Sequence, residues 1–481
     1  MASTKPGRQI GSVSSLSATL ITTRSTTNGL LIKPFKDIPG PKALPVIGTL
    51  HHYFITKKYS FEDLHNSCLS KYNEFGPIVR EEFAPDNVAV WLFNPEDIQK
   101  MYETEGKCPS RRSHLALEKY RLDHPESYNN GGLLPTNGPE WMRIRQAFQP
   151  LLKPQKVELF LDHNQRLCND FIAMIQDKDN SVGIPDFLEE LKKYFLELTG
   201  LFFLNERLEA IVRDLDPDST AHRLMEAAMN TNENVLKTDN GLPLWRWFDT
   251  KAYRSICEGQ AMIESVATEA IRRGSFQYEN HFDKKDAISF VADMLLAGID
   301  TTSYTMSFLL YHLSQNPSVQ DQLVQNKFDD PSGLKKYTYG KWVLQESLRL
   351  NPISIGNARI LPTDQEFSGY HVPAGTCLIS QNLIASRLEQ NFDSPYEFRP
   401  ERWERSNRKR YHPYLSLPFG FGKRMCIGRR LAEQGTLLLL NSLMTNFRFE
   451  WIGEGELGFR TKLINKPDRP LSFKLTHLKA L

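Results

Sequence analysis

Residues 419–428 read Phe-Gly-Phe-Gly-Lys-Arg-Met-Cys-Ile-Gly, and a leucine-rich segment with helical periodicity follows directly. Glycines on both sides of Cys426 allow a tight backbone loop whose amide groups can point at the sulfur. The N-terminus of the following helix favours the thiolate over the thiol, and Arg424 adds a positive charge two residues away. A thiolate presented to backbone donors is what an axial iron ligand requires.

Two interpretations of Cys426 other than an iron ligand have to be considered. A free cysteine is most often a buried structural residue. A phosphate-binding loop is excluded, because Lys423 is followed by Arg424 rather than by Ser or Thr and the glycine spacing differs. The segment resembles the haem-binding loop of the cytochrome P450 family, Phe-x-x-Gly-x-Arg-x-Cys-x-Gly, and fills every fixed position. This resemblance implies that Cys426 is the axial ligand of haem b (iron protoporphyrin IX), and that Phe419 and Gly428 belong to the cofactor-binding loop.

The composition is that of an ordinary globular protein of enzyme size. Its 481 residues (55.4 kDa) are 40% hydrophobic and 24% charged, so disordered, collagen-like and coiled-coil chains are excluded. No run approaches the ~18 to 20 apolar residues that span a bilayer. The six cysteines are scattered without paired spacing, which disfavours a disulfide scaffold or a structural zinc site. The 59 Lys and Arg nearly balance the 57 Asp and Glu, which argues against a nucleic-acid partner.

Helical periodicity dominates the chain. The clearest helical stretches are 155–175, 287–315, 341–350 and 427–444, and short strand-like stretches occur at 78–83, 88–93, 358–361 and 377–380. We therefore predict a mainly α fold with small β-sheets, built as one domain over residues 38–481. The resemblance implies the cytochrome P450 fold, with haem between a long central helix and the cysteine loop.

The first 37 residues differ from the rest of the chain. Residues 1–36 carry five basic residues, twelve Ser or Thr and no acid, and the first acid is Asp37. This composition is typical of a mitochondrial presequence, so we predict a targeting presequence and linker over 1–37. A disordered tail without targeting function is the alternative. The folded domain is expected to open at the proline-rich segment 38–41, Ile-Pro-Gly-Pro.

Residues 297–302, Ala-Gly-Ile-Asp-Thr-Thr, lie within the longest predicted helix. Glycine in a helix costs ~1 kcal/mol relative to alanine, and threonine can bond back to a carbonyl and bend the helix, so we expect a local opening. Alone, such a sequence is usually ordinary helix. It resembles the oxygen-binding motif of the P450 family. The resemblance implies that Ala297 and Gly298 contact the cofactor, and that Asp300 and Thr301 are catalytic and relay protons to bound dioxygen.

Cationic side chains are expected around the two haem propionates. Trp141 and Arg145 lie four residues apart and so share one helical face. Arg424 lies in the cysteine loop, and Arg359 falls on a short predicted strand. The resemblance implies that all three arginines bind propionates. For Arg145 or Arg359 taken singly, a surface salt bridge is the commoner arrangement.

A buried charge cluster is expected to hold the cysteine loop. Glu346 and Arg349 lie three residues apart on a predicted helix and can pair, although such pairs decorate many solvated helices. With Arg402 they resemble the structural triad of the P450 family. A buried three-charge cluster requires mutual pairing, so the loss of one member should cost ~3 to 5 kcal/mol.

The segment 405–432 is strongly basic, with eight Lys or Arg and no acid. Complementary charge steers a protein partner, and the resemblance to mitochondrial P450s implies an acidic [2Fe–2S] ferredoxin that delivers electrons from NADPH. Lys341 matches the first lysine of the pair that many mitochondrial members use, but Gln345 stands at the second. We therefore expect Arg429 and Arg430 to contribute more of the docking. A solvated basic surface without a partner is the alternative.

The substrate is predicted from resemblance alone. Residues 111–121 and 131–141 resemble arthropod mitochondrial steroid hydroxylases of moulting-hormone synthesis. This implies C22 hydroxylation of an apolar ecdysteroid precursor, on the matrix side of the inner mitochondrial membrane with peripheral membrane contact. Another sterol, a fatty acid or a xenobiotic is the alternative substrate. The connections 276–286 and 323–341 are shorter than is usual for the family, which indicates either trimmed surface loops or missing segments.

Two other functions remain open at this point. The first is a haem-thiolate isomerase or lyase that needs no reductant, against which Asp300, Thr301 and the basic segment argue. The second is a non-catalytic haem sensor or carrier, which has no need of an acid and a hydroxyl beside the oxygen site. A microsomal member fed by a flavin reductase is disfavoured, because no N-terminal anchor is found.

Overall fold

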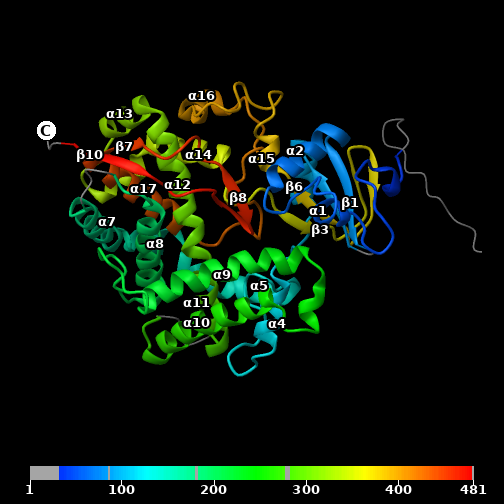
Figure 1. The fold of residues 1–481 in the computed structure, drawn as a ribbon, viewed down its shortest axis with the longest axis horizontal. Helices are drawn as coiled ribbons and strands as arrows, with labels where there is room; N and C mark the ends of the chain where they lie inside the picture. Colours follow the sequence, from blue (N-terminus) through cyan, green and yellow to red (C-terminus); the bar gives the residue numbers. More distant parts are fainter. Residues whose placement is uncertain (1–31, 85–86, 179–182, 277–281, 479–481) are drawn as a thin grey trace, which may run out of the picture.

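Helices make up most of the molecule, and a small sheet stands at one end of them (Figure 1). The computed structural model describes residues 32–84, 87–178, 183–276 and 282–478. The predicted fold class, mainly α with small β-sheets, is confirmed. Among these residues, no helix is both long enough and apolar enough to cross a membrane.

Within the described residues, the first ten α-helices lie between residues 51 and 273. They are α1 (His51–Phe54), α2 (Leu64–Phe75), α3 (Pro95–Glu103), α4 (Leu115–Leu122), α5 (Gly138–Phe148), α6 (Pro154–Leu159), α7 (Leu161–Gln176), α8 (Phe187–Leu204), α9 (Thr220–Asn240) and α10 (Lys251–Arg273). Short 3-10 turns lie at η1 (Phe35–Asp37), η2 (Gln149–Leu152) and η3 (Pro243–Arg246).

The later helices include the central helix and the helix after the cysteine loop. They are α11 (Lys284–Gly298), α12 (Asp300–Gln315), α13 (Pro317–Gln325), α14 (Thr338–Leu350), α15 (Asn382–Ala385), α16 (Arg405–Arg408) and α17 (Arg429–Asn446), with 3-10 turns η4 (Pro331–Lys336) and η5 (Pro400–Trp403). The helix predicted over 155–175 is divided at Phe160 into α6 and α7.

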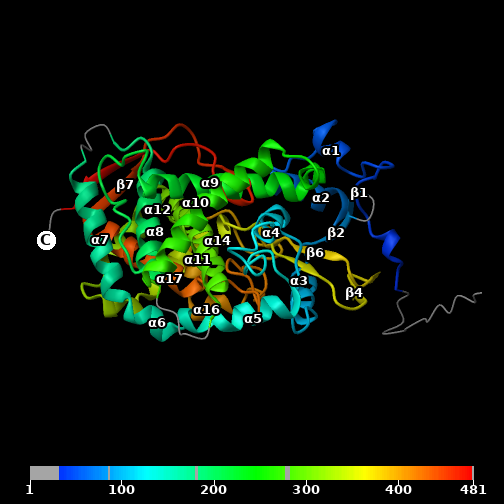
Figure 2. The same ribbon diagram turned by 90° about the horizontal axis from the view of Figure 1, so that it is seen from below.

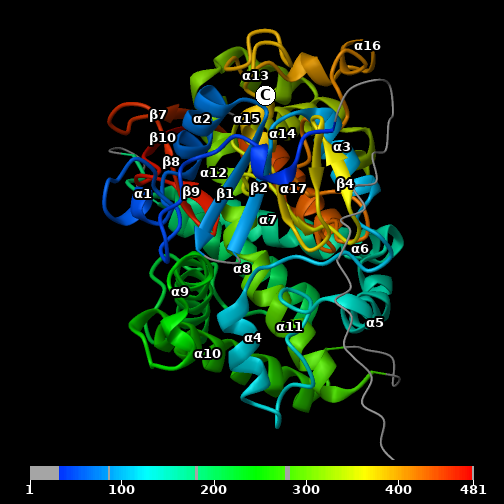
Figure 3. The same ribbon diagram turned by 90° about the vertical axis from the view of Figure 1, so that its right-hand side faces the viewer.

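In the part of the chain that the structure describes, the strands form one four-stranded sheet and three two-stranded ribbons, and the large sheet faces the viewer in Figure 3. Its order is β1 (Ile78–Ala84), β2 (Asn87–Leu92), β6 (Cys377–Ser380), β3 (Ala358–Ile360), with β2 and β6 parallel and the other pairs antiparallel. The ribbons are β4 (Gln365–Phe367) with β5 (Tyr370–Val372), β7 (Phe447–Trp451) with β10 (Phe473–His477), and β8 (Phe459–Lys462) with β9 (Ile464–Pro467). The four predicted strands are confirmed, each within one or two residues at each end.

The central helix is surrounded by other helices in all three views (Figure 2). α11 packs on α8, α9 and α10, while α12 packs on α8, α14 and α17. Side chains on several of its faces, including Phe290, Leu295 and Leu309, are fully buried. Because a buried side chain of this size stabilises the fold by ~1.5 to 3 kcal/mol, this helix is fixed in place by its neighbours.

The structure describes the predicted start of the domain and parts of the two connections expected to be short. Residues 1–31, most of the predicted presequence, lie outside the described residues. Packing against the domain begins before Ile38, because the Lys33 amide donates to Gly369 O (3.0 Å) and Phe35 contacts the apolar core beneath β4 and β5. Of the connection 276–286, residues 277–281 lie outside the described residues, and 323–341 is occupied by the end of α13, η4 and the start of α14.

Candidate functional site

Cys426 lies in a tight loop directly before α17. The loop closes through the Cys426 amide, which donates to Phe419 O (2.9 Å). Gly420 and Gly422 take φ values of +72° and +73°, a conformation that favours glycine. α17 begins at Arg429, so the amides of Gly428 and Arg429 are free to donate to the Cys426 sulfur.

The Cys426 sulfur is placed for an iron ligand by both its accessibility and its charge. Cys426 as a whole residue is exposed. Protein atoms nevertheless surround its sulfur, and this burial raises the pKa of the Cys426 thiol. The two amides and Arg145 act in the opposite direction, since they stabilise the thiolate. A bound metal cation would complete the deprotonation, because a coordinating thiol loses its proton outright.

A cluster of guanidinium groups stands beside this loop. Burial lowers the pKa of Arg424 to about 9, with further lowering from Arg111 and Arg359. Burial and the nearby Arg359 likewise lower the pKa of Arg111 to about 10. Burial also lowers the pKa of Arg145. Mutual repulsion among buried cations makes this cluster favourable to an anionic group.

Two of the three predicted propionate arginines, Arg424 and Arg145, lie with Trp141 at the loop. The Arg424 guanidinium lies 4.2 Å from the centroid of the Trp141 ring and donates to Pro109 O and Thr136 O (both 2.5 Å). Arg145, on the same helix α5 as Trp141, donates to Met425 O (2.9 Å). Helix α5 therefore presents an indole and a guanidinium to the cysteine loop, as the spacing predicts.

Arg359 also lies beside the loop, but a carboxylate already pairs with it. Its Nε donates to Glu105 (2.5 Å), and its other nitrogens donate to Ala358 O (2.9 Å) and Phe421 O (3.3 Å). The Arg359 side chain is 4% exposed and that of Glu105 is 6% exposed. A surface salt bridge is thus excluded for Arg359, and its role toward a propionate stays a prediction.

The donor set fits haem. A thiol beside two backbone amides that favour the thiolate matches a thiolate-ligated iron, and four guanidiniums match two carboxylates. Within the described residues, Arg111 Nε and Thr136 Oγ1 are buried and have no hydrogen-bond partner. Buried polar groups without a hydrogen-bond partner destabilise the fold unless a further polar group bonds to them. Propionate oxygens would supply that group.

The central helix is interrupted where the sequence predicts an opening. Ile299, with φ −83° and ψ −65°, separates α11 from α12. The hydroxyls of Thr301 and Thr302 donate to Ala297 O and Gly298 O (both 2.6 Å), four residues back. Ala297 and Thr301 are partly exposed on one helix face, whereas Asp300 is buried.

Gly298 is required for a different reason than expected. A Cβ atom at Gly298 would lie 2.8 Å from Thr199 Oγ1 on α8. The missing side chain therefore allows α8 and α11 to approach closely, rather than making room on the face of Ala297 and Thr301. A contact between Gly298 and the cofactor stays a prediction.

The Asp300 carboxyl points toward α9. Asn232 on α9 donates to Asp300 Oδ2 (3.0 Å), while Asp300 Oδ1 has no hydrogen-bond partner within the described residues. Burial raises the pKa of Asp300 to about 6, although Asn232 and the more distant Lys192 and Lys466 lower it. This carboxyl can therefore exchange a proton near neutral pH.

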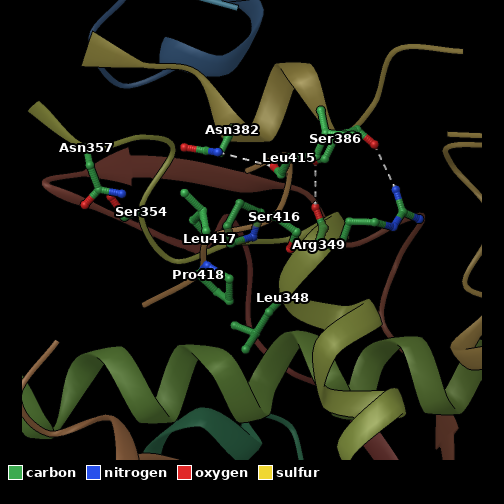
Figure 4. A pocket seen from close by; sticks show the side chains of 11 residues that line it. Leu348, Arg349, Ser354, Asn357, Asn382, Ser386, Leu415, Ser416, Leu417 and Pro418 are labelled. Atoms are coloured by element: carbon green, nitrogen blue, oxygen red, sulfur yellow. Dashed lines mark hydrogen bonds between the residues drawn. The ribbon is translucent and has the colours of Figure 1, made fainter. Parts of the chain in front are cut away.

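The predicted charge triad is buried beneath the segment that leads into the cysteine loop. Arg349 makes two bonds to Glu346 (2.8 and 2.9 Å), and Arg402 Nε donates to the same carboxylate (3.1 Å). All three side chains are fully buried. Figure 4 shows a small hollow between Arg349, Ser386 and residues 415–418, the stretch that leads into Phe419. Its volume of about 10 Å³ suits no substrate.

The predicted docking residues Lys341, Arg429 and Arg430 all lie near Glu433. Glu433, one residue beyond the basic segment, pairs with Arg429 (2.8 Å) and Arg430 (3.7 Å). Lys341 lies close enough for Glu433 to raise its pKa, although burial lowers it more. The other cations of the segment, such as Arg405 and Lys409, are exposed. The basic surface therefore exists, with Glu433 reducing its charge.

Three residues of this site were not found from the sequence: Glu105, Arg111 and Asn232. Arg111 had a weak signal, since Arg111-Arg112 lies within a segment already singled out by its resemblance. Glu105 and Asn232 carry no local signal. Their partners lie 254 and 68 positions away, and such contacts depend on the fold.

Comparisons with known proteins agree with this geometry. The family described as "Cytochrome P450" matches residues 38–290 and 273–475. "Cytochrome P450 302a1, mitochondrial" of Drosophila melanogaster is 42% identical over 469 residues, covering 92% of this chain and 95% of that protein. "Probable cytochrome P450 12a5, mitochondrial" is 30% identical over 503 residues (94% and 93% covered), and "Ecdysone 20-monooxygenase" 28% identical over 479 (92% and 88% covered), both from the same organism.

Proposed function

Because this chain belongs to the cytochrome P450 family of haem-thiolate monooxygenases, we propose that it is a mitochondrial steroid hydroxylase acting at C22 of an ecdysteroid precursor. The observation that carries the proposal is the 42% identity to cytochrome P450 302a1, mitochondrial, over 92% of the chain. The name of a second relative, ecdysone 20-monooxygenase, gives an ecdysteroid as a substrate within this group. The resemblance of residues 111–121 and 131–141 to the arthropod 22-hydroxylase disembodied supports the position of attack.

The proposed reaction replaces a C–H bond of the substrate with C–OH. One atom of dioxygen enters the substrate, and the other leaves as water with two protons and the two electrons of NADPH. Bound haem supplies the activation of dioxygen. In this assignment Cys426 is the iron ligand, and Arg145, Arg359 and Arg424, together with Arg111, hold the propionates.

The delivery of the two protons is assigned to two residues of the central helix, Asp300 and Thr301. Asp300 exchanges protons with its surroundings, and Asn232 holds its carboxyl in one orientation. Thr301, one residue further, presents its hydroxyl on the face that also carries Ala297. A hydroxyl both donates and accepts, so it can pass a proton between ordered water and bound dioxygen.

A [2Fe–2S] ferredoxin is the proposed electron donor, docked on Lys341, Arg429, Arg430 and the exposed cations of 405–410. The relatives named mitochondrial support this choice of partner. Opposite charge across the contact would accelerate association and make it sensitive to salt.

Peripheral contact with the inner mitochondrial membrane is supported by an exposed apolar patch. Large apolar side chains are 48 to 78% exposed at the N-terminal segment and after α9: Val46, Phe54, Ile55, Leu242, Leu244, Trp247 and Phe248. A cavity of about 400 Å³ between α1, α9 and β8 is lined by Phe54 and Asn240, so the two segments lie side by side (Figure 2). Apolar surface of this kind marks a membrane or protein contact.

Reconstitution tests the proposed function. The purified holoenzyme is combined with a [2Fe–2S] ferredoxin, its reductase and NADPH, and ecdysteroid precursors, other sterols and fatty acids are screened with identification of the product. We expect a 22-hydroxylated ecdysteroid and turnover that falls as salt rises. Oxygen at another position would contradict C22 attack, and turnover without reductant would favour the isomerase or lyase.

A further inference from the structure

Glu105 is a buried carboxylate at the edge of the cysteine loop, and it has no part in the proposed reaction. It lies two residues after α3 and is 7% exposed. Its Oε2 accepts from Arg359 Nε (2.5 Å), and its Oε1 is 3.4 Å from the backbone amide of Lys423. A buried charge is costly without a partner, so this carboxylate is retained for those contacts.

The Glu105 carboxylate packs directly against the backbone of the loop. A Cβ atom at Gly422 would lie 2.2 Å from Glu105 Oε1, and Gly422 has a φ of +73°. Glycine at this position therefore serves two purposes, the left-handed turn and the close approach of Glu105. The position of Cys426, four residues on, depends on this turn.

The chain around Glu105 holds the loop at further points. Lys423 Nζ donates to Lys107 O (2.9 Å), and Arg424 Nε donates to Pro109 O (2.5 Å). Arg359, held by Glu105, donates to Phe421 O (3.3 Å). Residues 105–109 thus form a strap along the loop, and the Glu105–Arg359 pair joins the strap, β3 and the loop.

Glu105 also sets the charge beside the cofactor site. Of the groups that act on Arg424, three are arginines that lower its pKa, and Glu105 is the carboxylate that raises it. It therefore offsets one of the positive charges that face the propionates. A more positive surrounding favours the reduced, less positive state of an iron centre.

We propose that Glu105 is a positioning residue of the haem site: through Arg359 and Gly422 it fixes the cysteine loop, and its charge lowers the reduction potential of the bound haem. The inference rests on the proposed assignment of Cys426 as the iron ligand. It adds a role for a residue outside the loop motif.

The test compares Glu105→Gln, Glu105→Ala, Arg359→Leu and the double change Glu105→Leu/Arg359→Leu with wild type. Glu103→Gln is the matched control, because Glu103 is an exposed glutamate two residues earlier. Haem dissociation is followed by transfer to an excess of apomyoglobin, and the midpoint potential by spectroscopic titration.

We expect Glu105→Ala to release haem at least tenfold faster, and Glu105→Gln to shift the potential upward. Arg359→Leu should also release haem faster than wild type, and the double change should release it no faster than the faster single change, because Glu105 and Arg359 act as one pair. If the Glu105→Ala variant does not accumulate as folded protein, haem release and midpoint potential of the isosteric Glu105→Gln variant alone test the proposal. Release and potential equal to those of Glu103→Gln would overturn the proposal.

A separate variant distinguishes this failure from failure of the ligand assignment. Cys426→Ser should lose the red-shifted carbon monoxide band that a thiolate ligand produces. If that band is lost and the Glu105 variants behave as wild type, only the role of Glu105 is wrong. If the band persists, the assignment of Cys426 is wrong and the proposal falls with it.

Discussion

Asp300 shows how a single residue departs from what stability alone would select. It is 1% exposed, one of its oxygens has no partner within the described residues, and burial raises its pKa from 3.8 to about 6. Holding this group ionised at neutral pH costs the fold about 3 kcal/mol. Residues kept at such a cost are concentrated at functional sites, where activity requires them.

Replacing Asp300 with Asn should stabilise the fold in a pH-dependent way. Between about pH 4 and pH 6 the folded protein keeps a proton that the unfolded chain has lost, so wild type loses stability as pH rises through this window. The amide introduced by Asp300→Asn cannot ionise and avoids this loss. We expect up to about 3 kcal/mol in favour of Asp300→Asn at pH 7.5 and little difference near pH 4, measured by denaturant unfolding. Asp218→Asn, at an exposed position, is the control. A pH-independent difference would contradict the burial of an ionised Asp300.

Replacing Thr301 with Ala should uncouple the reaction. In the proposed relay the Thr301 hydroxyl delivers protons to bound dioxygen, so its loss should raise the peroxide released per NADPH several-fold while haem content stays unchanged. Thr302→Ala is a matched control, since Thr302 makes the same bond to a carbonyl four residues back (2.6 Å). Equal coupling in the two variants would remove Thr301 from the relay.

Single residues also show what the sequence could predict. Cys426 and the pairs Trp141/Arg145 and Glu346/Arg349 were identified because their spacing is local and a loop or helix turn fixes it. Glu105 has its partner 254 positions away, and no pattern within a short window reports such a contact. Arg359 was correctly placed beside the loop, but its pairing with a carboxylate was not foreseen.

At the scale of elements, the triad joins α14 to η5 and to the segment before the cysteine loop. Arg349 donates to the carbonyls of Ser386 and Pro395, and Arg402 bonds to Glu346 and to residues 393–394. One buried cluster thus holds together segments that have little regular structure of their own. Its predicted structural role agrees with these contacts.

Replacing Arg402 with Ala should destabilise the protein by about 3 to 5 kcal/mol, because Glu346 keeps its buried charge and loses a partner. Arg399→Ala is the matched control: it lies three residues earlier, is 38% exposed, and pairs with the exposed Asp393. The control should cost less than about 1 kcal/mol. Similar unfolding midpoints for the two variants would contradict a structural role for the triad.

Glu433 is the element-scale prediction for the partner surface, since it pairs with Arg429 and Arg430 in the first turn of α17 and acts on Lys341 of α14. Glu433→Gln frees Arg429 and Arg430, so the ferredoxin should bind several-fold more tightly at low salt, with the gain lost at high salt. Arg430→Glu should weaken binding. Glu450→Gln, exposed on β7, changes the net charge equally and serves as control. Equal affinities for Glu433→Gln and Glu450→Gln would place the docking surface elsewhere.

The boundaries of elements were predicted less well than their existence. The periodicity over 287–315 indicated one helix, but the structure divides it at Ile299, where back-bonding threonines and the close approach of α8 to Gly298 meet. The helix predicted from 427 begins at Arg429, because the loop uses the amides of 428 and 429 for the sulfur. The close approach of α8 is a contact outside the local sequence. The threonine bonds and the loop amides are local, but helical periodicity does not report them.

The basic surface and the apolar patch lie on different elements. The surface involves α16 and the start of α17, and the patch involves α1 and the segment after α9. Figure 1 labels α16 and α17 apart from α1 and α9. A membrane on the patch and a ferredoxin on the basic surface would use different parts of the molecule. The near-neutral total of +2 hides this arrangement, because composition sums over the surface and reports no position.

Membrane binding is the prediction at this scale. In flotation with phosphatidylcholine–cardiolipin vesicles, Phe54→Ser/Ile55→Ser and Trp247→Ser/Phe248→Ser should each bind at least about tenfold more weakly than wild type, because each removes two exposed apolar side chains. Leu159→Ser is the control, since Leu159 is 76% exposed on α6, outside the patch. Equal loss in the control would show that the patch does not bind the membrane.

The most direct test of the account is the carbon monoxide spectrum of the reduced holoenzyme and of Cys426→Ser. Thiolate ligation should give wild type a strongly red-shifted absorption band, and the variant should lack it. A variant that keeps the band, or a wild type that never develops it with haem bound, would contradict the assignment of Cys426 as the ligand.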